Sequence, residues 1–201
     1  MDERNAPLPP LVKSQNLMSK YPGAHELPTA ELRTDDGMVK IRPVQNDAEA
    51  LEFEKMCRQS AEDCESFGID EFDEEGHFNR KLFRSSNIVL AEQASSGDIV
   101  GASIIGPAKL TRTPVSLLAH QYIIAKKGQN QSSVGEVLIN YGLSSIKQLG
   151  YKGVLSDIYP TNTYQVHLYN DFNFIFRGSL PYAGYLKGLV PSPSLLVYLR
   201  L

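Results

Sequence analysis

Apolar and polar residues alternate where the regular part of the chain begins, with Val39, Ile41 and Val44 separated by Lys40 and Arg42. A period of two predicts a strand with one buried face. Apolar runs rich in β-branched residues predict further strands at 87–93, 99–108, 117–125, 154–159, 174–177 and 194–201. The composition of residues 95–98 predicts a hairpin turn between the first two of these runs. A loop rich in Gly and Pro is expected between the last two.

Other segments have the period of 3.6 that predicts helices. The clearest helix has an apolar stripe made of Val134, Val137, Leu138, Tyr141, Ile146 and Leu149, and Gly150 stands at its expected end. Further helices are expected from Asp47 onwards, over roughly 74–83, and from Thr161 or Asn162 to Asp171. The order of elements predicts a single α/β domain of the α+β mixed-sheet kind, with a strand-helix-strand crossover between Leu117 and Tyr159.

The first residues of the chain follow neither pattern. Residues 1 to about 36 hold five of the twelve prolines. Proline removes a backbone donor and restricts φ, so this segment is expected to build neither a sheet nor a long helix. We expect residues 1–36 to form a flexible or loosely docked arm and residues 37–201 to form the folded domain. A Pro-rich ligand for a partner protein is the alternative for the arm.

Composition narrows the class of protein. The 201 residues are 42% hydrophobic and 21% charged, which suits one globular domain. A net charge of −3 argues against a nucleic-acid-binding protein, and the longest mostly apolar stretch, 99–108, is about half as long as a membrane helix requires. The N-terminus lacks a signal-peptide pattern, and Cys57 and Cys64 are expected to be reduced thiols without a metal. We expect a cytoplasmic protein, with the nucleus as the alternative.

The turn from Lys126 to Gly135 carries the first chemical signal, because it leaves a predicted strand and opens the clearest helix. The first N–H groups of a helix have no partner within it and carry the positive end of its dipole, so such a turn can bind a phosphate or pyrophosphate. A turn capped only by Ser and Asn side chains is the alternative. The spacings of a Walker loop and of a dinucleotide fingerprint are absent.

A second signal is the spacing of Asn162, Tyr169 and Asn173-Phe174. With the order of elements, it resembles the GNAT N-acetyltransferase superfamily, in which Asn is followed by Tyr seven residues later and then by Gly-Phe. The family's pyrophosphate loop, Arg/Gln-x-x-Gly-x-Gly/Ala, corresponds to Asn130, Ser133 and Gly135. The resemblance covers Met38 to Leu201. It implies a mostly antiparallel sheet of about seven strands flanked by four helices.

The resemblance also implies an activity, the transfer of an acyl group, most often acetyl, from acetyl-CoA to an amine. The acceptor would be a small amine or an amino-acid-like molecule that attacks the thioester directly, and no metal takes part. A non-catalytic module that binds acyl-CoA or another protein is the alternative. Neither nucleic acid nor membrane is an expected partner, and the chain is expected to be a monomer or a homodimer.

Candidate site residues follow from the same resemblance. The pyrophosphate would lie against Asn130, Gln131, Ser132, Ser133, Val134 and Gly135, and the pantetheine arm against Ile123, Ile124 and Ala125. Asn162 and Tyr169 complete the cofactor contacts, with Tyr169 also the acid that protonates the departing thiolate; a core tyrosine is the alternative. Asn130 and Ser133 depart from the family loop, so weakened binding is expected, which Lys126 and Lys127 could partly restore.

No family-wide base can be carried over. His120 and Asp157 are the candidates, because an imidazole or a carboxylate can accept the proton of an ammonium group; structural roles are the alternatives for both. The run 178–188 is similar to the ending of a fungal branch that includes acetyltransferases acting on proline analogues. That branch holds its acceptor with asparagines, where this chain has His120 and Ser156, which argues against such a substrate.

An acidic segment lies between the first two predicted helices. It contains Glu62, Asp63, Glu65, Asp70, Glu71, Asp73, Glu74 and Glu75. In the GNAT arrangement this segment borders the acceptor entrance, where negative potential would attract a cationic amine such as a polyamine or a basic peptide. A solvated acidic face is the alternative.

Overall fold

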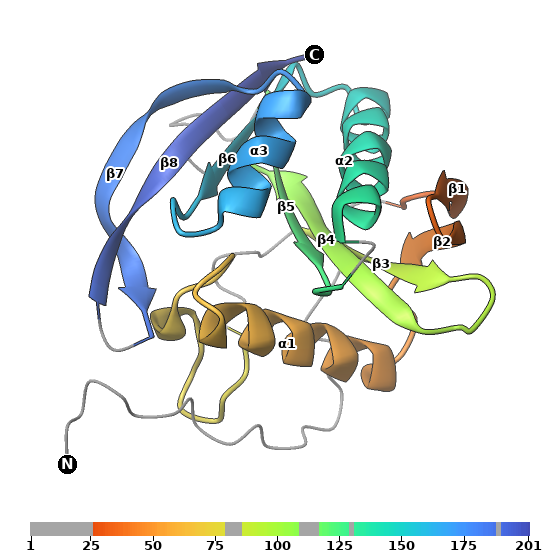
Figure 1. The fold of residues 1–201 in the computed structure, drawn as a ribbon. Helices are drawn as coiled ribbons and strands as arrows, with labels where there is room; N and C mark the ends of the chain where they lie inside the picture. The colour runs from red at the N-terminus through yellow and green to blue at the C-terminus, as the bar shows by residue number, and fades with distance from the viewer. Residues whose placement is uncertain (1–25, 79–85, 109–116, 129–130, 188–189) are drawn as a thin grey trace.

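The computed structural model describes residues 26–78, 86–108, 117–128, 131–187 and 190–201. In chain order, the elements are β1 (Ala30–Thr34), β2 (Gly37–Pro43), α1 (Asp47–Glu62), the short 3-10 helix η3 (Ile69–Glu71), β3 (Asn87–Gln93), β4 (Ile99–Pro107), β5 (Leu118–Ala125), α2 (Gln131–Gln148), β6 (Gly153–Ile158), α3 (Thr163–Asp171), β7 (Ile175–Leu186) and β8 (Val190–Arg200). The strands form one mixed sheet in the order β1-β2-β3-β4-β5-β6-β8-β7 (Figure 1). The expected α/β domain and its mostly antiparallel sheet are confirmed.

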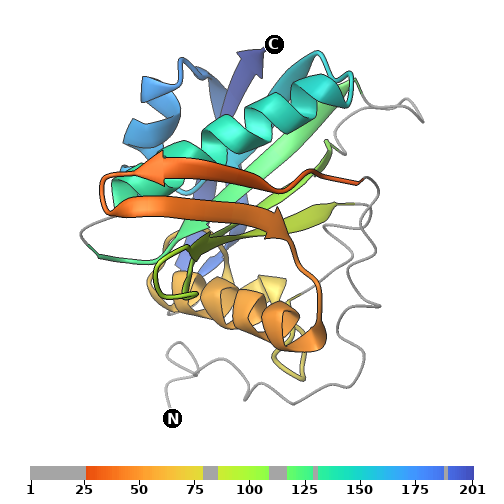
Figure 2. The same cartoon turned by 90° about the vertical axis from the view of Figure 1, so that its right-hand side faces the viewer.

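The sheet separates two hydrophobic cores. Figures 1 and 2 show α1 on one face and α2 with α3 on the other. Neighbouring residues of one strand point into opposite cores: Val89 packs with the residues of α2, whereas Leu90 packs with those of α1. Ile123 and Ile124 divide in the same way. Because both faces of the sheet are covered, a strand such as β3 is a continuous apolar run and not an alternation of apolar and polar residues.

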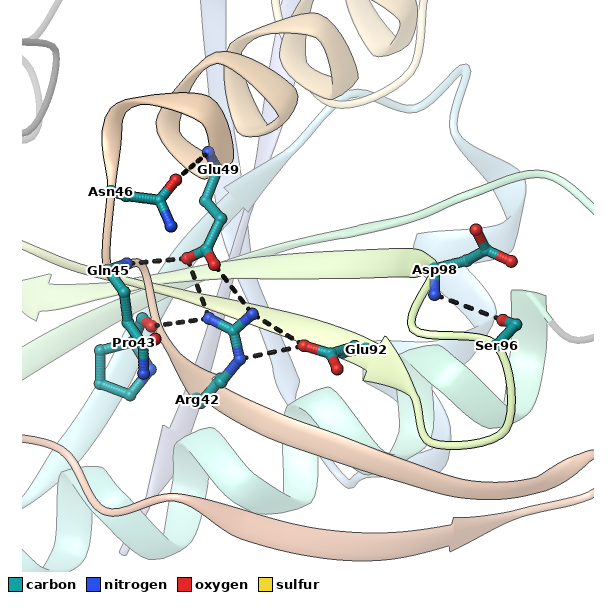
Figure 3. Close-up of polar contacts among 8 residues, drawn as sticks. All are labelled: Arg42, Pro43, Gln45, Asn46, Glu49, Glu92, Ser96 and Asp98. Atoms are coloured by element: carbon teal, nitrogen blue, oxygen red, sulfur yellow. Dashed lines mark hydrogen bonds and ion pairs between the residues drawn. The ribbon is translucent and has the colours of Figure 1, made fainter.

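Helix α1 is held to the sheet by a partly buried ion-pair network (Figure 3). Asn46 caps the helix, with its side chain accepting a hydrogen bond from the Glu49 N–H at 3.0 Å. The guanidinium of Arg42, on β2, donates to Glu49 on α1 and to Glu92 on β3. The start of α1 is therefore positioned by contacts to two strands.

Eight strands are present where about seven were predicted, because the expected arm contributes one. β1 lies within residues 1–36 and pairs antiparallel with β2, from Ala30 opposite Ile41 to Thr34 opposite Gly37. The expectation that this segment builds no sheet is wrong for these residues. The five prolines all precede Thr29, so the backbone donors of β1 are intact. Residues 1–25 lie outside the described part of the chain, and a flexible or docked arm there stays a prediction.

The helix predicted over 74–83 is wrong for its described part. Residues 74–78 are not helical, and 79–83 lie outside the described residues. η3 comes earlier, and Phe72 then forms an isolated bridge with Phe78. Gly76, between them, has a φ of 77°, which ends any helical run. Packing of the Phe72 and Phe78 rings, 5.6 Å apart, holds this segment in a loop.

The prediction of a long loop between the last two strands is also wrong, because the strands occupy most of that segment. β7 has 12 residues and β8 has 11, and they pair as one long hairpin at the edge of the sheet. Two register shifts in β7 absorb the irregular residues, including Gly178 at φ 153° and Tyr182 at φ 56°. Pro191 and Pro193 lie beyond Leu195, the last residue of β8 that pairs with β6, so no ladder bond to β6 is lost.

The central crossover is confirmed. β5, α2 and β6 form the expected unit, and β5 and β6 run parallel. α2 ends before Gly150, which has a φ of 85°, as its position predicts. Both cysteines are free thiols. Among the described helices, none is long and apolar enough to cross a membrane.

Candidate active site

Strands β5 and β6 separate soon after they meet. Their described pairs are only Leu118 opposite Gly153 and Ala119 opposite Val154. The carbonyl oxygen of Leu118 accepts a hydrogen bond from the Ala108 N–H, and the Lys126 N–H donates to the Val100 carbonyl, so both groups point to the β4 side. The even-numbered residues of β5 therefore direct their backbone groups to β4. By alternation, the N–H and C=O groups of Gln121, Ile123 and Ala125 face the opening between β5 and β6. We call this opening the splay.

Side chains of β6 and α3 enter the splay from the α2 and α3 face. The carbonyl oxygen of Gln121 accepts hydrogen bonds from Ser156 Oγ and from the Tyr169 hydroxyl, each at 2.7 Å. The carbonyl oxygen of Ile123 accepts one from Gln165 Nε2, also at 2.7 Å. Two carbonyls that parallel pairing would have satisfied are thus satisfied by side chains.

On the α1 face, one hydrogen bond crosses the splay from strand to strand. Tyr122 of β5 packs with the core under α1, and its hydroxyl donates to Asp157 Oδ1 on β6. Burial first, and then the negative charge of Asp157, raise the pKa of Tyr122 well above its usual value. The Tyr122 hydroxyl therefore stays protonated and donates to Asp157 at neutral pH.

Tyr169, for which the resemblance implies the role of the acid, lies on α3. Its side chain is 1% exposed and meets the Phe174 ring edge-on at 4.8 Å. Burial raises the pKa of Tyr169, so the phenol keeps its proton at neutral pH. Its hydroxyl lies at the splay, bonded to the Gln121 carbonyl. This position suits either an acid beside the opening or a core tyrosine that closes a backbone bond, the two roles left open by the sequence.

Asn162 caps α3 in the structure. Its side chain accepts a hydrogen bond from the Gln165 N–H at 3.0 Å, and the residue is 4% exposed. Both Asn162 Nδ2 and Gln165 Nε2 lie within hydrogen-bond distance of Ser66 Oγ, at 3.4 and 2.7 Å. The loop after α1 is therefore joined to the start of α3, next to the splay.

The start of α2 borders the same opening. Gln131 is its first residue, and the Gln131 carbonyl accepts a hydrogen bond from the Tyr164 hydroxyl at 2.7 Å. Ser133, Val134 and Gly135 are buried, whereas Ser132 is exposed. A Cβ on Gly135 would meet the Tyr164 hydroxyl, so this glycine permits the close packing of α2 and α3. Asn130 lies outside the described residues.

A pocket of about 420 Å³ lies between α1 and the end of β5. Its lining residues are Glu52, Lys55, Met56, Gln59, Ser60, Asp63, Glu65, Ile124, Ala125, Lys126 and Lys127. Lys126 Nζ lies 3.2 Å from a Glu52 oxygen, and Lys127 Nζ lies 3.2 Å from oxygens of both Asp63 and Glu65. The two lysines expected to help a phosphate are therefore engaged with carboxylates, and a phosphate would have to compete for them.

His120 and Asp157, the two candidate bases, lie on the α1 face of the sheet with Tyr122 between them. The rings of His120 and Tyr122 are 5.3 Å apart. His120 Nδ1 lies 3.1 Å from the Pro107 carbonyl, which accepts from it, and His120 Nε2 lies 3.0 Å from Ser86 Oγ. With both ring nitrogens engaged, His120 can accept a substrate proton only by releasing Ser86.

Glu71 is a titratable residue that sequence reasoning did not single out. It ends η3, and its carboxylate accepts the Gly68 N–H at 2.8 Å. Burial raises the pKa of Glu71 to about 8, the Gly68 bond opposes this, and the charges of Asp157 and Asp70 add to it. In the sequence, Glu71 is one of many acidic residues; its apolar neighbours Phe67 and Phe72 are the available signal that it does not simply face solvent.

Comparison with solved structures identifies the fold. A GCN5-related N-acetyltransferase from Kribbella flavida superposes with a TM-score of 0.64 at 17% identity over 81% of this chain and 98% of its own. A ribosomal-protein-alanine N-acetyltransferase from Brucella melitensis gives 0.64 at 16% identity, over 80% of this chain and 99% of its own. The yncA protein from Salmonella typhimurium, solved with its cofactor acetyl-CoA, gives 0.65 at 12% identity, over 81% and 94%.

No protein-family model matches the sequence, and no curated protein sequence matches it either. The likeness therefore lies in the three-dimensional arrangement of the elements, and eight similar structures have sequence identities of 12–18% to this chain. The chain has the fold of the GCN5-related N-acetyltransferases.

Proposed function

We propose that this protein is an acyl-CoA-dependent N-acyltransferase that transfers an acetyl group to a small amine or amino-acid-like acceptor. The observation that carries the proposal is the splay of β5 and β6 beside the start of α2, within this fold. Such an opening offers backbone groups for an extended amide-bearing ligand, and the helix start offers N–H groups for its phosphates. One structure of similar fold was solved with acetyl-CoA.

The residues around the opening fit acetyl-CoA in part. Acetyl-CoA, when bound, supplies the activated thioester. The N–H groups of Ile123 and Ala125 face the splay and would bind its amide groups, with Ile124 completing the strand. The first turn of α2, from Gln131 to Gly135, would bind its phosphates together with Asn130. Asn162 would contribute mainly by holding α3 in place, because its side chain is already bonded.

Two proton transfers are required in this reaction. Tyr169 is the proposed acid for the leaving thiolate, because it is protonated at neutral pH and lies at the splay. The proton of the acceptor ammonium needs a base on the α1 face. Of the two candidates named from the sequence, Asp157 is better placed than His120 to bind the ammonium group, because both nitrogens of His120 are bonded. A proline-analogue acceptor of the fungal branch is not part of this proposal.

A specific observation favours a second candidate, a module that does not catalyse transfer. The Gln121 and Ile123 carbonyls already accept hydrogen bonds from Ser156, Tyr169 and Gln165. A pantetheine arm using the Ile123 carbonyl would have to displace the Gln165 amide. A chain that keeps these bonds would bind acyl-CoA weakly and act through contacts with other proteins.

Calorimetric titration with acetyl-CoA, with desulfo-CoA as a control, tests the proposal. We expect a dissociation constant in the micromolar range, corresponding to about −8 kcal/mol. Ser132→Asp adds a negative charge to the exposed first turn of α2 and should weaken binding about tenfold. Ser144→Asp, at another exposed serine later in the same helix, is the matched control and should not change the affinity for acetyl-CoA.

Turnover then separates the two candidates. A screen of amines with acetyl-CoA should reveal release of free CoA for at least one acceptor. No binding of acetyl-CoA at millimolar concentration would overturn the enzyme proposal. Binding without turnover of any amine would favour the non-catalytic module.

A further inference from the structure

Three carboxylates gather beside the splay on its α1 face, each without a cationic partner. Asp157 accepts the Tyr122 hydroxyl, Glu71 accepts the Gly68 N–H, and Asp70 accepts the Tyr185 N–H at 2.9 Å. No Lys, Arg or His within the described ranges pairs with any of them. The carboxylates of the neighbouring pocket, by contrast, are matched by lysines.

These charges act on one another and on the nearby phenols. The charges of Asp157 and Asp70 contribute to the raised pKa of Glu71, after burial. Burial, followed by the charges of Glu71, Asp70 and Asp157, also raises the pKa of Tyr159. A bound cation would offset the repulsion among these carboxylates, because its positive charge would lie close to several negative groups that are partly shielded from water.

An independent feature of the same face is a buried hydroxyl without a partner. Ser194 is 1% exposed, and no hydrogen-bond partner for its Oγ is found in the described structure. Ser194 stands on β8 between Ser192, which pairs with Gly184, and Leu196, which pairs with Asp157. Because side chains alternate along a strand and paired residues share a face, Ser194 lies on the same face as Asp157. Burying a hydroxyl without a partner is costly, so its presence here points to a polar ligand group.

The surroundings of Ser194 extend this face to Glu71. A Cβ on Gly184, two ladder positions away, would meet the Tyr159 hydroxyl and lie 3.4 Å from Asp70 Oδ1. A Cβ on Gly68, whose N–H bonds Glu71, would lie 3.1 Å from that same Tyr159 hydroxyl. The loop after α1, the end of β6 and the hairpin of β7 and β8 therefore meet around the Tyr159 hydroxyl, although they are far apart in the sequence.

We propose that Asp157, Glu71 and Ser194 bind the ammonium group of a cationic amine at this place, and that Glu71 takes its proton. The Ser194 hydroxyl and the Asp157 carboxylate accept ammonium N–H bonds, and one proton passes from nitrogen to a Glu71 oxygen. The freed lone pair is then available on the side of the splay where β5 and β6 separate. A pKa of about 8 makes Glu71 a far better proton acceptor for an amine than an ordinary glutamate.

The acyl-transfer step that follows rests on the proposed function. The amine nitrogen forms a bond to the acetyl carbon while the carbon–sulfur bond breaks, and Tyr169 gives its proton to the sulfur. The second nitrogen proton restores Tyr169, and Glu71 releases its proton to water. The products are the amide, the free thiol and one proton, so atoms and charge balance.

Amine binding in the absence of acetyl-CoA tests the inference with the full chain. The probe is 1,5-diaminopentane, titrated calorimetrically, and 1,5-pentanediol is its uncharged control. We expect the diamine to bind and the diol not to bind. Glu71→Gln and Asp157→Asn should each weaken diamine binding at least tenfold. Glu74→Gln, an exposed glutamate of the same acidic segment, is the matched control and should change binding less than twofold.

Two further readouts distinguish the assigned roles from general loss of charge. Wild-type affinity for the diamine should rise between about pH 6.5 and pH 8.5 as Glu71 loses its proton, and Glu71→Gln should abolish that rise. Asp157, Asp70, Tyr122 and Tyr159 also face this group, and their variants should keep the rise, moved to lower pH where the charge of Asp157 or Asp70 is removed. Ser194→Ala should weaken diamine binding while leaving thermal stability equal or higher, because it removes a buried hydroxyl that has no partner.

Several results would overturn the inference. The inference is wrong if the diamine does not bind either with or without saturating desulfo-CoA. It is also wrong if the diol binds as tightly as the diamine. Binding of Ca²⁺ or Mg²⁺ that Glu71→Gln and Asp157→Asn abolish, without any diamine binding, would show a metal site instead. Acetyl-CoA titration is independent of all these, so a failure here is distinguishable from a failure of the proposed acyltransferase function.

Discussion

Arg42 offers the most direct test of how α1 is held beside the site (Figure 3). Its Nη1 and Nη2 atoms each lie 2.9 Å from an oxygen of Glu49, and its Nε and Nη2 atoms lie 3.0 and 2.7 Å from Glu92 Oε2. The three side chains are 11%, 17% and 24% exposed. Arg42→Ala therefore leaves two half-buried carboxylates facing each other without a cation.

The expected loss can be estimated from these contacts. Hydrogen bonds to charged groups contribute about 1.5–3 kcal/mol each, but partial exposure to solvent screens them. We expect Arg42→Ala to lower the free energy of unfolding by about 2–3 kcal/mol in total at pH 7, measured by urea denaturation. Lys55→Ala is the control, because the Lys55–Glu52 pair is 3.4 Å apart and 58% and 35% exposed. It should cost less than about 0.5 kcal/mol.

The difference should also depend on pH in one direction. The hydrogen bond from Arg42 is the main cause that lowers the pKa of Glu49 in the folded protein, with burial opposing it. A lowered folded-state pKa gives stability that is present above the unfolded value of about 4.3 and is lost as pH falls through the folded value. The gap between wild type and Arg42→Ala should therefore shrink when unfolding is repeated at about pH 3.5. A gap below about 1 kcal/mol at pH 7, or one that does not change with pH, would refute this reasoning and assign the effect to packing of the Arg42 stem.

Three further predictions concern the interior. Tyr169→Phe should cost about 1 kcal/mol in urea denaturation, because the β5 carbonyl keeps its other donor; as the proposed acid, it should also lose about 100-fold in kcat, and an unchanged kcat would remove it from the chemistry. Gly135→Ala should lower stability by about 1–3 kcal/mol, because the new methyl meets the Tyr164 hydroxyl; an unchanged melting temperature would contradict the close packing of α2 and α3. His77→Leu should cost about 3 kcal/mol or more, because it removes a partner 2.6 Å from the fully buried Glu54. Adding Glu54→Leu should recover part of that loss, whereas strictly additive losses would argue against coupling.

Much of the fold could be predicted because local patterns specify it. The apolar stripe of α2, the left-handed Gly150 after it and the Asn162 cap of α3 depend only on residues a few positions apart. Strand β2 likewise follows from a two-residue period, and strands β3 to β6 follow from short apolar runs. The spacing of Asn162 and Tyr169 indicates the fold because Asn162 caps the helix that carries Tyr169.

The predictions that were wrong concern features that depend on contacts between distant segments. β1 is a strand because β2 offers it an edge, and residues 74–78 form a loop because the Phe72 and Phe78 rings pack together. The hairpin of β7 and β8 extends through glycines and prolines because register shifts absorb them. None of these features has a period that a sequence pattern would reveal.

The same distinction between local sequence and distant contacts applies to the candidate site. The sequence by itself indicated the strand, the turn and the helix that border the opening, since these follow one another along the chain, but it did not indicate Gln165 or Glu71. Only the tertiary structure decided their chemical state. It pairs Lys127 with Asp63 and Glu65, fills the splay with Gln165, and raises the pKa of Glu71 by enclosing it beside Asp157. Charge and solvation depend on what surrounds a group in space, and those neighbours come from segments that the chain brings together only on folding.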